Sequence, residues 1–314
     1  MLEWFRRSKK TEQGWLAISL EAGAVGFVHG QFSSSGPSAI SRCGARTLEA
    51  NQAGPDRLAR ELPVGRFQCA TLLRPGEYQL LLVEAPTVPR DELKSALRWR
   101  IKDMVDYHMD DATLDVLDIP PERSGAAGNH SMYAVSARND VIQARIKQFE
   151  DARIPLSVID IPETAQRNIA ALFESEGRGL ALLYLGNDFG LLTINFGGEL
   201  YLGRRIDAGI EQLKGASEQA RESAMNRILV ELQRTFDHFE RQFRHVSVTQ
   251  LLLGPEPEDT GLLAYLSANL GLPVARVELA EKLAFQTQEP PGPAEQWRLF
   301  HLMGASLRHE DKVL

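Results

Sequence analysis

Short apolar runs separated by turn residues open the chain. Residues 15–20 and 25–28 are mostly apolar, and Glu21-Ala-Gly-Ala between them has the composition of a tight turn. Residues 33–40 are rich in serine, glycine and proline, which favours a loop. A strand, a turn and a buried strand are expected over residues 72–83. The pattern predicts that the chain begins with a small sheet.

Helical spacing of apolar residues first appears after two prolines, Pro86 and Pro89. It predicts a helix capped by Asp91 whose inner face carries Leu93, Leu97, Ile101 and Met104. Further strands are expected over residues 113–119, 132–135 and 157–160, and helices over residues 140–149 and 162–173. Buried strands that alternate with covering helices are typical of an α/β fold.

A second copy of the opening pattern follows at an offset of 165 residues, which places Ile18 on Leu183. Strands are predicted over residues 180–185, 190–194 and 199–202. Such self-similarity suggests two related halves, although two hairpins can also resemble each other by chance. The rest of the chain is expected to contain a long amphipathic helix over residues 220–243, two short strands, a further helix and a last helix that carries Trp297 to Leu307.

The composition narrows the class of protein. The chain has 314 residues, 35 basic and 42 acidic, and 43% of its residues are hydrophobic. These values exclude a disordered or collagen-like chain, and the lack of a long Lys/Arg block argues against nucleic-acid binding. No apolar stretch reaches the roughly 18 residues of a membrane span. Two cysteines are too few for a disulfide framework and indicate a reducing compartment.

The order of several segments resembles the actin-like ATPase superfamily, and most closely the PilM-like type IV pilus assembly proteins. The two strand-turn-strand units, Leu251-Leu-Leu-Gly254 and Gly304-Ala-Ser306 occur in the family's order. Residues 96–103 and 110–119 are similar to the inner-membrane platform protein of the mannose-sensitive haemagglutinin (MSHA) pilus, and residues 201–209 and 231–239 also match the family in order. The resemblance covers about residues 14–309.

This resemblance implies an α/β, actin-like (ribonuclease H-like) fold of two lobes with a small inserted α+β subdomain. The expected boundaries are a basic and aromatic leader at residues 1–13, a first lobe at 14–175 with the insertion at about 36–125, and a second lobe at 176–314. Each lobe should open with an antiparallel three-stranded meander. Gly304-Ala-Ser306 lacks the second glycine of a hydrolase nucleophile elbow and is interpreted as a helix packing site.

The resemblance also locates a nucleotide site, which is degenerate in this sequence. In the family, each repeat carries an Asp two positions before a Gly, for Mg²⁺ and phosphate respectively. Ser19 and Glu21 occupy these positions in the first repeat, and Tyr184 and Gly186 in the second. A Gly-Gly pair that contacts adenosine in the family is Gly254-Pro255 here, which lacks one backbone N–H.

Asp188 is an alternative carboxylate for this site, although it lies four positions late. We therefore expect no ATP hydrolysis and no cofactor; the alternative is residual binding of ATP with Mg²⁺. No phosphate-binding loop of the G-x-x-x-x-G-K-[ST] type is present. The run of aspartates over residues 103–118 lacks calcium-loop spacing and is interpreted as a solvated edge, so no metal site is predicted.

Two segments are candidates for binding other molecules. Arg98, Trp99 and Lys102 place cations beside a large aromatic residue, a combination frequent at interface hot spots, although Trp99 could instead cover the core. The leader combines aromatic and basic residues that would suit an anionic membrane surface, unless this end is simply frayed. Its membrane-contact candidates are Trp4, Phe5, Arg6, Arg7, Lys9 and Lys10.

The function implied by the resemblance is a non-catalytic scaffold of a type IV (MSHA-type) pilus or a related secretion machine. It would lie in the cytoplasm at the inner face of the bacterial inner membrane. Its expected partner is the cytoplasmic N-terminal tail of a PilN-like bitopic membrane protein, with possible peripheral membrane contact and no nucleic acid. The alternatives are an ATP-binding or ATP-hydrolysing switch of the same fold and, more distantly, a filament-forming cell-division protein.

Overall fold

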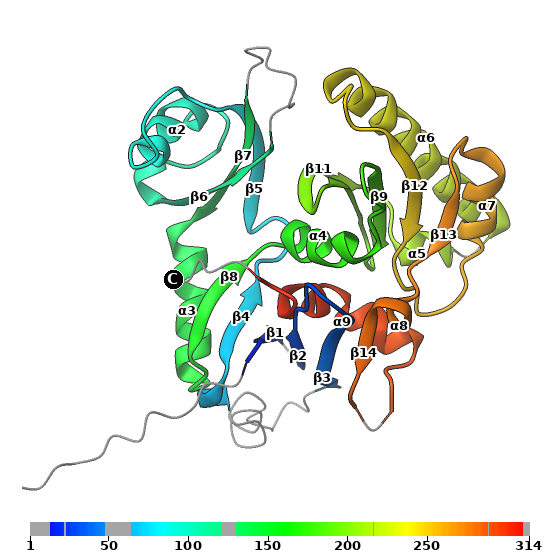
Figure 1. The fold of residues 1–314 in the computed structure, drawn as a ribbon, viewed down its shortest axis with the longest axis horizontal. Helices are drawn as coiled ribbons and strands as arrows, with labels where there is room; N and C mark the ends of the chain where they lie inside the picture. The colour runs from blue at the N-terminus through cyan, green and yellow to red at the C-terminus, as the bar shows by residue number, and fades with distance from the viewer. Residues whose placement is uncertain are drawn as a thin grey trace, which may run out of the picture.

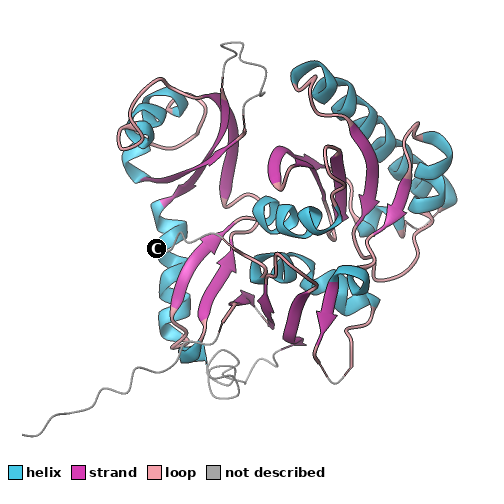
Figure 2. Cartoon of the chain, viewed as in Figure 1, coloured by secondary structure: helices cyan, strands magenta, loops and turns pink. Residues whose placement is uncertain are grey.

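The computed structural model describes residues 13–21, 23–47, 64–120, 130–215, 217–287 and 289–309 (Figure 1). The leader candidates at positions 4 to 10 lie outside these residues, so their role stays a prediction. The described part contains a six-stranded sheet, a five-stranded sheet and a three-stranded sheet, with helices between and around them (Figure 2). None of its helices is long and apolar enough to span a bilayer.

The six-stranded sheet forms the core of the first lobe and has the order β14-β3-β2-β1-β4-β8. Strands β1 (Trp15–Glu21), β2 (Ala24–Gln31) and β3 (Ser38–Thr47) form an antiparallel meander, as predicted. Strands β4 (Gln68–Leu72) and β8 (Leu156–Asp160) extend the sheet in parallel. Residues 38–40, expected in a loop, belong to β3 because Ala39 and Ile40 pair with the end of β2.

The second lobe repeats this arrangement in a separate sheet of order β11-β10-β9-β12-β13. Strands β9 (Gly179–Leu185), β10 (Gly190–Phe196) and β11 (Glu199–Ile206) form the antiparallel meander. Strands β12 (Val248–Leu253) and β13 (Val274–Arg276) then run parallel to β9. The prediction that each lobe opens with an antiparallel three-stranded meander is confirmed, and the two meanders lie in separate sheets.

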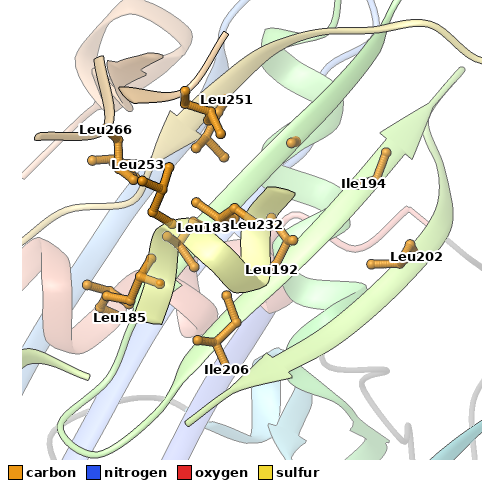
Figure 3. Packing of buried hydrophobic residues seen from close by; sticks show 14 of the residues in the cluster. Leu183, Leu185, Leu192, Ile194, Leu202, Ile206, Leu232, Leu251, Leu253 and Leu266 are labelled. Carbon is orange, nitrogen blue, oxygen red and sulfur yellow. The ribbon is translucent and has the colours of Figure 1, made fainter. Parts of the chain in front are cut away.

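The second lobe is built around an apolar core on the outer face of its sheet (Figure 3). Leu183 and Leu185 of β9 point to this face, because alternate residues of a strand point to opposite sides. They pack against Leu232 of the long helix α6 (Glu218–Gln242) and Leu266 of α7 (Leu262–Asn269). A short helix, α5 (Ile210–Leu213), packs against α6.

Two helices lie between the sheets (Figure 1). Helix α4 (Pro162–Phe173) packs on β9, β10 and β11, whereas α9 (Pro293–Ser306) packs on β1 to β4. The two helices cross where a Cβ atom on Gly304 would lie 2.0 Å from the carbonyl oxygen of Ala165. Only glycine permits so close an approach, which confirms Gly304 as a helix packing site.

The inserted subdomain is smaller than predicted. It consists of the sheet β5-β7-β6, formed by β5 (Tyr78–Glu84), β7 (Ser131–Arg138) and β6 (Ala112–Asp118), and helix α2 (Leu93–Ile101), with a short helix, η2 (Met109–Asp111), before β6. The expected start at residue 36 is wrong because β3 and β4 pair within the first sheet. The described insertion therefore begins after β4, at the strand that starts with Tyr78. The expected end at about residue 125 is also wrong, because β7 pairs with β5 and β6 as far as Arg138.

The boundary of the second lobe also needs correction. Helix α8 (Leu279–Lys282) is followed by β14 (Leu283–Phe285), which pairs in parallel with β3 of the first sheet. Helix α9 follows and packs on the same sheet. The chain thus returns to the first lobe after β13, so residues 176–314 are not one lobe. Helix α3 (Asn139–Asp151) and the short helix η1 (Val64–Arg66) complete the first lobe on its outer face.

Helix α2 is also shorter than its apolar pattern suggested. Leu97 and Ile101 are fully buried, but the helix ends at Ile101 and Met104 is 48% exposed. The residue at the N-cap is Glu92, and its side chain makes no capping hydrogen bond.

Candidate functional site

The structure places three of the predicted nucleotide-site positions, Glu21, Tyr184 and Gly254, near one another. Ser19 and Glu21 lie at the end of β1, and Tyr184 at the end of β9. Gly254 follows β12, and a Cβ atom placed on it would lie 3.3 Å from the Tyr184 ring. Burial raises the pKa of Tyr184, and the negative charge of Glu21 raises it further. The ends of β1 and β9 are therefore close enough for the charge of Glu21 to act on Tyr184.

Tyr184 occupies the interlobe space with its own ring. It is 8% exposed, and its ring stacks on Phe300 of α9 with a centroid distance of 5.2 Å. Its hydroxyl donates a hydrogen bond of 3.0 Å to the carbonyl oxygen of Trp297, and the Trp297 indole N–H donates one of 2.6 Å to the carbonyl of Leu185. These contacts attach α9 of the first lobe directly to the second lobe.

Polar residues on helices α4 and α9 add further contacts between the two lobes. Gln166 of α4 donates through its amide nitrogen to the carbonyls of Leu182 and Leu191. Its amide oxygen lies 3.2 Å from the Nε2 atom of His301. Burial lowers the pKa of His301 to about 3. The imidazole is therefore neutral at physiological pH and suited to a hydrogen bond with Gln166.

The turn that would bind phosphate in the second repeat is closed by hydrogen bonds within the chain. The Gly186 N–H donates a hydrogen bond of 2.8 Å to the Phe189 carbonyl, so this donor is already used. The carbonyls of Gly186 and Asn187 accept from Ile210 and Glu211 at the start of α5. Asp188 is exposed at the tip of this turn. These hydrogen bonds hold the turn in place and use the Gly186 N–H, which is therefore not available to an anion.

The segment after β12 carries acidic residues that are already paired. Glu256 is buried next to Pro255, accepts a hydrogen bond from Thr260 and lies 3.2 Å from Arg276. Glu258 forms an ion pair of 2.9 Å with Lys214, which follows α5. The Gly254 N–H donates a hydrogen bond of 2.8 Å to the carbonyl of Leu183. At the position that the resemblance matches to the family's adenosine contact, the Gly254 N–H and the nearby carboxylates are therefore used for internal contacts.

The partner candidates on α2 have different environments. The guanidinium of Arg98 donates to the carbonyls of Met109 and Ala112, so this residue holds the segment after α2 in place. Trp99 is 75% exposed, and the Lys102 ammonium lies 5.4 Å from its ring centre. The interpretation of Trp99 as a lid over the core is wrong. Trp99 and Lys102 share a surface, whereas Arg98 has a structural role.

A second part of the junction is hollow. A cavity of about 340 Å³ lies where the insertion, the start of α4 and the second sheet meet. Its walls include Tyr78, Glu163, Phe189 and Arg205, none of which sequence reasoning selected. The only available signal was that residues 201–209 matched the family, since this range contains Arg205. Within the described ranges, no group of three or more His, Cys, Asp or Glu residues is placed to hold a metal ion.

Comparison with known proteins supports the fold. A chain of a PilM–PilN type IV pilus biogenesis complex superposes with a TM-score of 0.67 at 18% identity, covering 96% of this chain and 99% of that chain. A Bacteroides thetaiotaomicron protein of unknown function with an actin-like ATPase fold gives a TM-score of 0.50 at 9% identity, covering 90% and 96% of the two chains. No family model and no curated protein matches the sequence. The predicted actin-like α/β fold is thus confirmed.

Proposed function

We propose that this protein is a PilM-like scaffold in the assembly machinery of a type IV pilus, of the MSHA type or a related secretion machine. The observation that carries the proposal is the likeness, over 96% of the chain, to a chain of a complex named for PilM and PilN. The proposed place of action is the cytoplasmic face of the inner membrane. There the protein would bind the cytoplasmic N-terminal tail of a PilN-like bitopic protein.

The insertion offers a surface for this tail. Trp99 is a large apolar side chain that remains mostly in water, with Lys102 beside its ring. Tryptophan anchors are frequent in interface hot spots, and a tail that orders on binding depends on few strong anchors. We infer that the tail docks between the first lobe and the insertion and contacts Trp99 and Lys102.

We further propose that the scaffold neither hydrolyses ATP nor needs it. Ser19 and Tyr184 supply no carboxylate for Mg²⁺, and the Tyr184 ring is packed on Phe300 where the lobes meet. Thermal melting with MgATP tests this, because a ligand at 100 times its dissociation constant adds about 2.7 kcal/mol of stability. We expect no shift of the melting temperature; a shift together with phosphate release would support the ATPase alternative.

The docking proposal is tested with a peptide of the N-terminal tail of the source organism's PilN-like protein. The double variant Trp99→Ala/Lys102→Glu should weaken peptide binding at least tenfold, about 1.4 kcal/mol, as measured by calorimetry. Lys147→Glu on the exposed face of α3 is the matched charge control. A folded double variant that binds at wild-type strength would move the tail to another surface, and a wild-type protein that binds no tail would overturn the scaffold proposal.

A further inference from the structure

The cavity beside α4 has apolar walls and two charged groups. Leu80 of β5, Leu191 of β10 and the Phe189 ring line it, together with Glu163 and Arg205. Its volume of about 340 Å³ lies within the range of small-molecule pockets, roughly 300 to 1,000 Å³. The cavity is therefore large enough for a compact organic molecule or for a side chain of another protein.

Glu163 is the buried charged group. It is 7% exposed, and its carboxyl accepts a hydrogen bond of 2.5 Å from the Tyr78 hydroxyl. No basic side chain of the described residues forms an ion pair with it. Burial raises the pKa of Glu163, although the Tyr78 hydrogen bond opposes this rise. A carboxylate here lacks the cation that buried charges normally require.

Asp160, three residues before Glu163, is a buried carboxylate whose charge is balanced by hydrogen bonds and a cation. Its carboxylate accepts hydrogen bonds from the Ile161 N–H and the Thr164 hydroxyl and forms a buried ion pair of 2.6 Å with Arg308. Both carboxyls lie at the β8–α4 junction, but only Glu163 borders the cavity. The missing cation of Glu163 can thus be supplied from the cavity.

Arg205 is the second charged group of the lining. Its guanidinium lies over the Phe189 ring, 4.9 Å from the centroid, and its side chain is 53% exposed. Its acidic neighbour, Asp207, is 3.8 Å away and almost fully exposed, so the ion pair is weak. A guanidinium held by an aromatic ring is well placed to bind a carboxylate.

We propose that this cavity binds a compact zwitterion, with its ammonium group at Glu163 and its carboxylate at Arg205. The hydrocarbon part of the ligand lies against Leu80, Leu191 and Phe189. The ammonium group and the carboxylate can belong to one free molecule, either an amino acid with a long side chain or an ω-amino acid. They can also belong to a basic and an acidic side chain that are adjacent in a partner peptide. Either source joins the insertion to α4 and the second sheet.

The test uses 6-aminohexanoate as the probe with the full-length protein. Its binding is followed by NMR through the methyl groups of Leu80 and Leu191, which report on the cavity itself. We expect saturable shifts at millimolar or lower concentration, and at least tenfold weaker binding of hexylammonium and of hexanoate, each of which has one charge. The substitutions Glu163→Gln and Arg205→Gln should each weaken the binding of 6-aminohexanoate at least tenfold. Arg234→Gln on the exposed face of α6 is the control and should leave binding unchanged.

Gly203→Ala gives an independent check through the shape of the cavity. A Cβ atom there would lie 3.0 Å from Glu163 and 3.0 Å from Leu80, so it should displace both and reduce binding. The proposal is overturned if 6-aminohexanoate causes no shift at 20 mM, or if it binds Glu163→Gln as tightly as wild type. Displacement of the probe by the PilN-like tail peptide identifies the peptide source, and tighter binding of free lysine than of that peptide identifies the free amino acid. Neither result depends on the tail binding at Trp99.

Discussion

Helix α4 contributes to two parts of the interlobe junction that are packed in opposite ways. Within a turn of its start, Ala165 lies next to Gly304 of α9, and Gln166 joins His301 to the second sheet. At its start, Glu163 has Tyr78 as its side-chain partner and faces a cavity of about 340 Å³. The same helix thus takes part in a sealed region and in a hollow one.

The difference shows how the pairing of polar groups separates structural from ligand-binding regions. In the sealed region the hydroxyl of Tyr184, the indole of Trp297 and the amide of Gln166 each have partners on another element. Because their hydrogen bonds are complete, a ligand would have to replace them. In the hollow region a buried carboxyl and a half-exposed guanidinium still have binding capacity. Ligand binding therefore costs least where the junction is hollow.

The largest expected effect is at the crossing of α4 and α9. Gly304→Ala should destabilise the protein by about 5 kcal/mol or more, because its Cβ would lie 2.0 Å from a backbone oxygen and the helices must separate. Denaturant unfolding measures the loss. Gly271→Ala, where a Cβ atom would have no neighbour within 4 Å, is the matched control and should be near neutral. Equal stability of the two variants would show that the lobes are not held together at this crossing.

The next effect separates the Tyr184 ring from its hydroxyl. Tyr184→Ala should cost about 3–5 kcal/mol because a buried aromatic ring leaves a cavity. Tyr184→Phe should cost about 1 kcal/mol, the net value of the hydrogen bond to Trp297. Chemical denaturation of both variants gives the comparison. If Tyr184→Ala is as stable as wild type, the region around Tyr184 is not packed as described. If the variant gains MgATP binding, the Tyr184 ring blocks a nucleotide site in the wild type.

The smallest effect is the pH dependence of the sealed region. The pKa of His301 falls from its ordinary value near 6.5 to about 3 in the folded protein. Folding then excludes a proton that the unfolded chain binds, so stability is retained above pH 6.5 and is lost as the pH falls from 6.5 toward 3. Between pH 7 and 5, the free energy of unfolding of the wild type should fall by about 2 kcal/mol more than that of His301→Gln. His238→Gln, at an exposed site on α6, should behave like wild type.

Much of the fold could be predicted because each lobe repeats a local pattern. The apolar runs at residues 15–20 and 180–185 became β1 and β9, and proline at position 162 marked the start of α4. The boundaries of the insertion could not be found in this way. Strand β3 is assigned to the first sheet by its pairing with β2, a contact between segments that no local periodicity encodes. The return of β14 to β3 is more distant still, joining Leu283 to Ser38.

The sequence indicated which residues stand at the matched nucleotide-site positions, but not how their side chains pack. The offset between the repeats aligned Ser19 with Tyr184 and Glu21 with Gly186, yet only the structure shows that Tyr184 packs on Phe300. The cavity was missed because its lining comes from separate elements, and Glu163 in a helix sequence gives no sign of burial. Arg98 and Trp99 are adjacent in sequence but point to different environments, since Arg98 reaches two backbone carbonyls and Trp99 reaches water.

The return of the chain to the first lobe has a consequence for the order of folding. Strand β14 and helix α9 are synthesised after the whole second lobe. Strand β14 then extends the edge of the first sheet, and α9 covers the inner face of this sheet through contacts such as Leu302 near Gly26. Until they emerge from the ribosome, the inner face of β1 and β2 is exposed and aggregation-prone. The first lobe is therefore translated first but completed last. Ribosome-bound chains that stop before residue 283 should contain a protected second meander and a first meander that remains open to proteolysis.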